Sequence, residues 1–174
     1  MSSRSFGKAV KDIEPLAEAL SNHTARACQK LRNQKSKTQG IYVFLKTNIH
    51  HTNEEQYKGQ ITHMCDTPLS DTGAIIHHAK ACLQKIYRKE LTYKKTGILL
   101  MNLIPESDLQ QDFFATNNPD KNNELMACMD HINESLGKDT VFHAAQGTKK
   151  SWRARCERRS PRYTSEWKEL AKVY

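Results

Sequence analysis

Hydrophobic positions along the first 105 residues follow two periods. After Asp12 apolar residues recur every three or four positions as far as Leu31, and a second stripe of this kind runs from Asp71 to Tyr87, which predicts two amphipathic helices. Between and around them lie β-branched and aromatic runs that are typical of strands. The runs read as strands are 3–10, 41–47, 58–65 and 91–104.

The resulting order, β-α-β-β-α-β, predicts an α+β fold. We expect a four-stranded, mostly antiparallel sheet with both helices on one face and the other face free. Asp12 or Glu14 can cap the first helix and Asp71 the second, and Pro68 is expected to break the chain just before the second helix. The polar run "RNQKSKTQG" is expected to separate the first helix from the second strand.

The periodicity stops at Pro105 and resumes in "NELMACMDHINESLG", a short helix over 123–137 that Gly137 ends. Its apolar residues are expected to face inward: Leu125, Met126, Met129, Ile132 and Leu136. This pattern divides the chain into a main domain (1–105), a connector (106–122) and a small helical C-terminal region (123–174).

Charge changes sign after residue 105 and again after residue 145. The main domain is basic, the stretch 106–145 is acidic, the last 29 residues are basic again, and the net charge is +8. A basic body favours nucleic-acid binding or solubility alone. The longest apolar run, "GILLMNLIP", is too short to span a bilayer, and five scattered cysteines without a C-x-x-C pair fit the reducing cytoplasm.

The positions of the acidic and histidine residues in the sequence give little support for catalysis or metal binding. Two-metal nucleotidyl transfer needs carboxylates clustered on adjacent strands, whereas the acids of the main domain fall at caps, in loops or on helix exteriors. His50-His51 and His77-His78 suggest a metal, and His78 shares a helix face with Cys82, but no partner pair is visible. We therefore expect no catalytic residue, metal or cofactor.

Several segments resemble one family over nearly the whole chain. "SRSFG", "YKKTGILLMNL", "QQDFF", "AAQG" and "SPRYT" with its flanking tryptophans resemble the C-terminal part of UmuC-type, Y-family translesion DNA polymerases, which act in the SOS response. The resemblance implies a little-finger domain for 1–105 and a short C-terminal domain after it. Palm, fingers and thumb would lie N-terminal to Met1, so we expect a piece of a longer polymerase.

The resemblance places primer-template DNA on the free face of the sheet. Little fingers carry a basic pair followed by glycine where Lys94, Lys95 and Gly97 stand, and a glycine lets DNA approach the main chain. Because neighbouring strand residues alternate in direction, only one of the two lysines is expected to face DNA fully. The residues expected to contact DNA are Arg4, Ser5, Lys46, Lys58, Lys94, Lys95 and Gly97.

"QQDFF" in the connector resembles the linear peptide by which bacterial replication and repair proteins bind the β sliding clamp. The matching residues are Gln110, Gln111, Asp112, Phe113 and Phe114. Gln111 replaces the leucine often found there. The alternative is that the two phenylalanines pin the connector onto the domain.

The tail interleaves aromatic rings with arginines. It suggests a surface for a protein partner or single-stranded DNA, and the resemblance favours the UmuD′ dimer and RecA; a solvated basic helix is the plain alternative. The residues expected to bind partners are Trp152, Arg153, Arg158, Arg159, Arg162, Tyr163 and Trp167. An independent ferredoxin-like nucleic-acid or protein-interaction module remains open, with Tyr42 and Phe44 as possible stacking residues.

Overall fold

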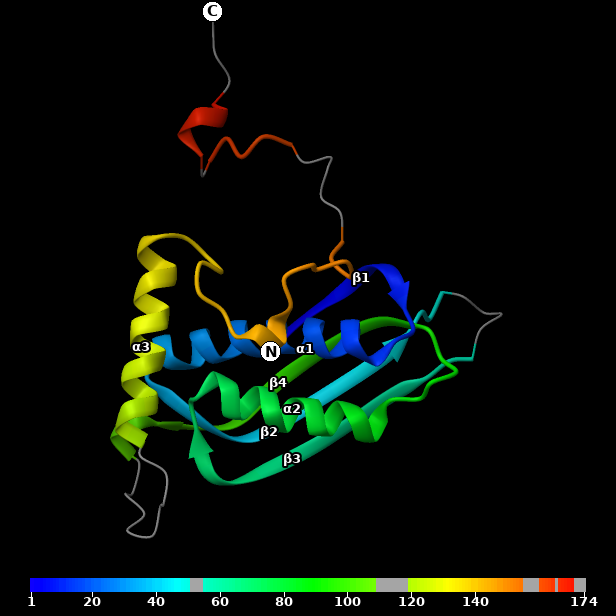
Figure 1. The fold of residues 1–174 in the computed structure, drawn as a ribbon, viewed down its shortest axis with the longest axis horizontal. Coiled ribbons are helices and arrows are strands. Elements are labelled where there is room, and N and C mark those ends of the chain that lie inside the picture. The colour runs from blue at the N-terminus through cyan, green and yellow to red at the C-terminus, as the bar shows by residue number, and fades with distance from the viewer. Residues whose placement is uncertain (51–54, 109–118, 155–159, 165, 171–174) are drawn as a thin grey trace, which may run out of the picture.

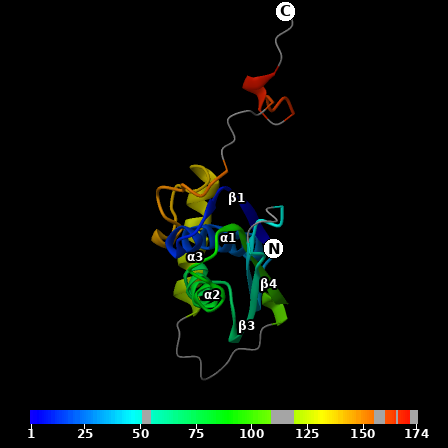
Figure 2. The same ribbon diagram turned by 90° about the vertical axis from the view of Figure 1, so that its right-hand side faces the viewer.

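One antiparallel sheet with the strand order β1-β4-β2-β3 carries both main helices on one face (Figures 1 and 2). The computed structural model describes residues 1–50, 55–108, 119–154, 160–164 and 166–170. No helix in these ranges is long and apolar enough to cross a membrane. The elements are β1 (Ser2–Val10), α1 (Ile13–Asn33), β2 (Ser36–Thr47), β3 (Lys58–Leu69), α2 (Thr72–Ile86), β4 (Tyr93–Pro105), α3 (Pro119–Ser135) and the short 3-10 helices η1 (Glu106–Asp108), η2 (Ala144–Gln146) and η3 (Trp167–Glu169).

The core lies between this sheet and the two helices, as the alternation in the sequence predicts. Ile41, Val43 and Leu45 of β2 are fully buried on the helix side, and the stripes of α1 and α2 pack onto them. Asp71 caps α2, where its Oδ1 accepts from the Ala74 N–H at 2.6 Å. The α+β class and the order of elements are therefore confirmed.

Several boundaries differ from the prediction: α3 spans Pro119–Ser135 instead of 123–137, and β2 and β3 are longer than expected. β2 begins at Ser36, inside the polar run expected to be a loop, and β3 continues through Pro68 to Leu69. The proline is tolerated because β3 is an edge strand, where a missing N–H need not break a ladder. The β2–β3 register also shifts between Thr38 and Gly40, next to this segment.

Among the described residues, the helix α3 contacts the body through a charged pair, a buried side chain and a hydrogen bond from the Ser70 hydroxyl to Asn123 Oδ1 at 3.4 Å. Arg32 of α1 binds Asp130 in a bidentate pair, with distances of 2.6 Å from Nε to Oδ2 and 2.8 Å from Nη2 to Oδ1, and Met126 is buried. Leu125 and Leu136 are exposed, so the expectation that all five apolar residues of this helix face inward is wrong. A 17-residue helix attached at one side buries only a narrow stripe.

The segment after α3 returns to the body and lines the outer edge of β1. The Asn22 side chain donates to the Gln146 carbonyl at 2.6 Å, and the Gly7 N–H donates to the Trp152 carbonyl at 3.1 Å. The Trp152 ring joins the main core, edge-on to Phe6 with ring centroids 6.3 Å apart. Residues 144–152 are therefore part of the same packed body as the sheet.

Candidate nucleic-acid interface

The second face of the sheet is left open by the described residues. Figure 2 shows α1, α2 and α3 on one side of the strands and none of them on the other. Directly paired residues of antiparallel strands share a face, so the register defines this surface. Its successive rows are Ser5, Lys95, Lys46 and Lys58; Ser3, Gly97, Phe44 and Gln60; Leu99, Tyr42 and Thr62; and Met101, Gly40 and Met64.

One row across all four strands is cationic. Lys46 of β2 lies directly opposite Lys95 of β4 on one side and Lys58 of β3 on the other, and Ser5 of β1 follows Lys95. We call the three lysines of this row, together with the neighbouring Lys94, the lysine row: Lys46, Lys58, Lys94 and Lys95. The free face therefore changes from cationic at this end to apolar at the methionine end.

A β-bulge turns both lysines of β4 to the open face. Lys95 pairs with Lys46 and Tyr93 pairs with the next residue, Thr47, so Lys94 is an extra residue in β4. Tyr93 and Thr96 are both fully buried on the helix side although they lie three residues apart. Lys94 is next to Tyr93 and Lys95 is next to Thr96, so each lysine points away from the helix side, toward the open face. The expectation that only one of the two lysines could face a ligand fully is therefore wrong.

The lysine row has no acidic counterpart on its face. None of its members takes part in an ion pair among the residues that the structure describes, and the rows of the open face contain no carboxylate. The Lys46 ammonium lies 5.3 Å from the centre of the Phe44 ring, a weak cation–π contact. Like charges placed directly opposite destabilise a sheet, so a bound polyanion would relieve this repulsion.

Burial and nearby cationic side chains keep a histidine of α1 neutral. The pKa of His23 on α1 falls from 6.5 to about 4, first because the ring is buried and then because of the charges of Arg26, Arg4 and Lys95. His23 is thus neutral at pH 7. Its ring lies edge-on to that of Trp152, with centroids 6.0 Å apart.

Two residues expected at the interface lie elsewhere. Arg4 pairs with the buried Thr96, which places it on the helix side of the sheet. Gly97 is on the open face but is buried, and a Cβ there would clash with Ser3 Cβ and lie 2.7 Å from Phe44 Cζ. Its missing side chain makes room for the Phe44 ring, so the physical reason given for a DNA contact at Gly97 is wrong.

Comparisons with known proteins identify the family of this chain. Residues 1–113 match the impB/mucB/samB family C-terminal domain. The chain belongs to this family. Residues 123–173 match a domain of unknown function, DUF4113.

Relatives of this family align with almost the whole chain. The chain is 36% identical to protein UmuC of Salmonella typhimurium over 98% of its own length and 41% of that protein. It is 34% identical to protein MucB of Escherichia coli, over 97% of the chain and 40% of MucB, and 30% identical to protein ImpB of Salmonella typhimurium over the same shares. The chain thus spans about two fifths of these relatives, and its resemblance to the C-terminal part of UmuC-type proteins is confirmed.

The tail residues fall into different environments. Trp152 is only 5% exposed and belongs to the core, so the expectation that it contacts a partner at the surface is wrong. Arg153 is exposed. Tyr163 and Trp167 are exposed, Trp167 to 87%, and Arg162 is bound by Glu169 at 2.8 Å, which raises the pKa of Arg162 and lowers that of Glu169.

Some predicted residues lie outside the described ranges. These are the clamp-peptide residues Gln110, Gln111, Asp112, Phe113 and Phe114, together with Arg158 and Arg159. Their assignments stay predictions from the sequence.

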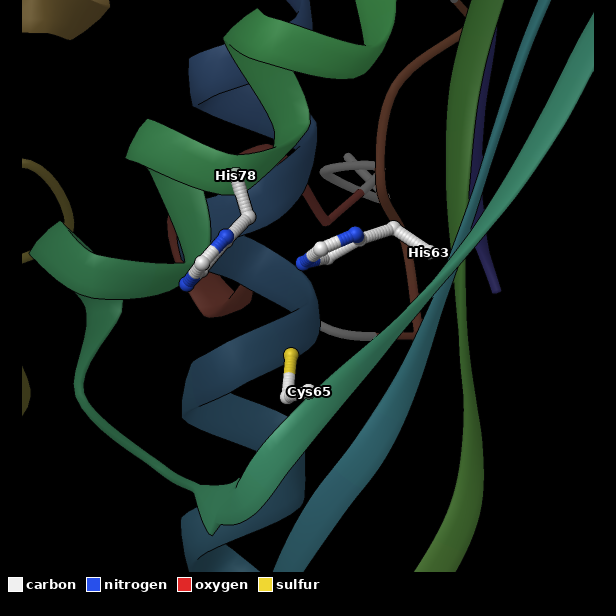
Figure 3. A group of neighbouring side chains, drawn as sticks. All are labelled: His63, Cys65 and His78. Atoms are coloured by element: carbon white, nitrogen blue, oxygen red, sulfur yellow. The ribbon is translucent and has the colours of Figure 1, made fainter.

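A cluster that the sequence did not reveal lies between β3 and α2. Figure 3 shows His63 and Cys65 on β3 and His78 on α2 directed toward one another. One ligand atom from each residue lies within 4.8 Å of the others, and the two imidazole rings stack with centroids 4.7 Å apart. From the spacing in the sequence, only Cys82 on the same helix face could be expected near His78. The other members of the cluster, His63 and Cys65, come from the adjacent strand.

Proposed function

We propose that this chain is a non-catalytic region of an UmuC-type, error-prone translesion DNA polymerase, which holds primer-template DNA and recruits partner proteins. The observation that carries the DNA-binding role is the lysine row on the open face. Family membership supports the polymerase context, and the proposed setting is SOS DNA repair in the cytoplasm.

The lysine row suits a duplex backbone better than a base sequence. Ammonium groups bind phosphates as point charges and carry no sequence information, and a polymerase must hold DNA of any sequence. Ser5, at the end of the same row, adds a hydroxyl donor for a phosphate oxygen. Repulsion among the four lysines falls as each phosphate is neutralised.

Duplex binding with matched lysine variants tests this role. Fluorescence anisotropy with a labelled primer-template should show clearly weaker binding for the double variant Lys46→Ala/Lys95→Ala. The control, Lys80→Ala/Lys85→Ala, removes the same charge from the exposed side of α2 and should bind nearly as the unmodified chain does. Equal losses in both variants would mean that only net charge matters, and would reject an interface on the open face.

The absence of catalysis is a separate expectation. Incubated with primer-template, Mg²⁺ and nucleotides, the chain should give no extension product. Extension that survives removal of contaminating polymerases would contradict a purely DNA-holding role.

Recruitment of the β sliding clamp is proposed for "QQDFF". Two aromatic rings entering a preformed groove can supply a few kcal/mol, while Gln110 would satisfy polar groups at its mouth. The double variant Phe113→Ala/Phe114→Ala should lose clamp binding and keep its melting temperature. A large fall in melting temperature would instead show that the rings pin the connector to the body.

The exposed aromatic residues of the tail are proposed to contact the UmuD′ dimer and RecA. Tyr163 and Trp167 are exposed, and Arg162 precedes Tyr163 in the chain; aromatic and arginine side chains are enriched at protein interfaces. The variant Trp167→Ala should weaken capture of UmuD′ or RecA by the chain without changing its stability. Unchanged capture of both would exclude this surface.

A single-strand-binding module is the second candidate, favoured by the position of Tyr42. The ring of this residue lies on the open face, half-buried, with its hydroxyl donating to Gln60 Oε1 at 2.8 Å, where a base could stack. Tyr42→Phe should preserve stacking and Tyr42→Ala should abolish it. If Tyr42→Ala weakens single-strand binding strongly and duplex binding little, the second candidate is preferred.

A further inference from the structure

We propose that His63, Cys65 and His78 form a binding site for a late transition-metal ion, with Zn²⁺ as the best match. The site joins the edge strand β3 to the helix α2 (Figure 3). It lies on the helix side of the sheet and is separate from the lysine row.

The topology places the three ligands together. His63 and Cys65 are two residues apart on β3, so both project to the same face, and His63 pairs with the buried Ile41, which fixes that face as the helix side. His78 reaches the same cluster from α2, the helix that packs on this face of the sheet. Two ligands from a strand and one from the helix packed on it give a site that exists only in the folded chain.

The distances are close to those of a metal site. Tetrahedral Zn²⁺ with Zn–N near 2.1 Å and Zn–S near 2.3 Å requires ligand atoms about 3.3–3.6 Å apart. The ligand atoms here lie within 4.8 Å of one another, so rotations of the imidazole rings out of their present stack can close the remaining gap.

The donor types select the ion. Two imidazoles and one thiol suit Zn²⁺ and related late transition metals, whereas Mg²⁺ and Ca²⁺ prefer oxygen donors. Three protein ligands leave a fourth position for water or another group.

The surroundings allow a metal ion to enter. His63 and His78 are half-buried, so solvent reaches the cluster, while Cys65 is 6% exposed. A bound metal ion would replace the thiol proton of Cys65 and clamp α2 to the free edge of the sheet.

Co²⁺ is a direct probe because its thiolate complexes absorb light. The untagged full chain, reduced and metal-free, is titrated with Co²⁺ and then with Zn²⁺. We expect one ion per chain, a cobalt–thiolate charge-transfer band together with the visible bands of four-coordinate Co²⁺, and displacement by Zn²⁺. Thermal unfolding with and without Zn²⁺ should show a higher midpoint for the bound chain.

Matched variants separate the site from chance binding. Cys65→Ser should remove the charge-transfer band, and His63→Gln or His78→Gln should weaken binding by roughly tenfold or more. His77→Gln, a neighbouring exposed histidine, and Cys128→Ser, an exposed thiol on α3, should leave binding unchanged. The proposal is overturned if the band persists in Cys65→Ser, if Co²⁺ binds only at millimolar concentration, or if Zn²⁺ raises the midpoints of the unmodified chain and the three ligand variants equally.

Discussion

Replacing Trp152 by alanine tests how firmly the C-terminal segment is attached to the body. The indole is 5% exposed and packs edge-on against Phe6 and His23. A buried tryptophan removes about 200 Å² from water, which at about 25 cal/mol per Å² corresponds to about 5 kcal/mol. Alanine retains a small part of this, so Trp152→Ala should lower the free energy of unfolding by about 3–4 kcal/mol.

If Trp152→Ala weakens this attachment, we expect the segment to open locally at a lower free energy than the whole domain. The Gly7 N–H that donates to the Trp152 carbonyl at 3.1 Å would then exchange with solvent faster. We therefore expect two results for Trp152→Ala: a lower urea midpoint by far-ultraviolet circular dichroism, and faster hydrogen–deuterium exchange in the peptide that contains Gly7.

Trp167 supplies the matched control. Its ring is 87% exposed, and Trp167→Ala should change the free energy of unfolding by less than about 0.5 kcal/mol. If Trp152→Ala costs less than about 1 kcal/mol and the exchange at Gly7 is unchanged, the indole does not hold the segment to the core and the reasoning is refuted.

Three further substitutions test other contacts. The pKa of His23 is about 4 in the folded chain and 6.5 in its unperturbed form, so the unfolded state binds more protons between these pH values. The free energy of unfolding should therefore keep its full value above pH 6.5 and fall by up to about 3 kcal/mol toward pH 4. In His23→Gln, urea midpoints measured across that range should depend less on pH. Asp130→Asn should lower the free energy of unfolding by about 1–3 kcal/mol at pH 7, because Arg32 loses its charged partner; an unchanged urea midpoint would show that this pair is not needed to hold α3. Gly97→Ala should destabilise by about 1–3 kcal/mol, since its Cβ would meet Ser3 and Phe44. Gly40→Ala should be milder, because its Cβ would lie 3.3 Å from Met64 Sδ, 3.4 Å from Met101 Cβ and 3.6 Å from the Met101 carbonyl oxygen; equal melting temperatures would refute the packing argument.

The main elements could be predicted because local rules determine them. The helical stripes of α1 and α2, the alternation around Ile41, Val43 and Leu45, and the Asp71 cap are all short-range patterns, and each is found in the structure. The same alternation separates the face that packs the helices from the open face. Pro68 is accommodated because β3 is an edge strand. The edge position follows from the strand order, which these short-range patterns do not determine.

The details of the candidate sites depend on contacts between distant residues. Whether Lys94 and Lys95 share a face depends on a bulge opposite Lys46, and periodicity counted along one strand cannot show it. Gly97 has a packing role that appears only once the Phe44 ring from β2 lies over it.

The tail and the histidine cluster show the same limit. Trp152 resembles a surface aromatic in a basic tail, yet it reaches the core formed by Phe6 and α1. His63 and His78 are fifteen positions apart in the sequence, and only the packing of α2 on β3 brings them together.

The salt dependence of duplex binding tests the lysine row most directly. Anisotropy titrations of a labelled primer-template at several salt concentrations give the slope of log affinity against log salt, and each neutralised phosphate contributes roughly 0.9 to it. For the variant with alanine at Lys46, Lys58, Lys94 and Lys95, the slope should be smaller in magnitude by roughly 3–4, while Lys80→Ala/Lys85→Ala keeps the original slope. An identical slope for the four-lysine variant and the unmodified chain would contradict the account, because the DNA backbone would then be held somewhere other than the open face of the sheet.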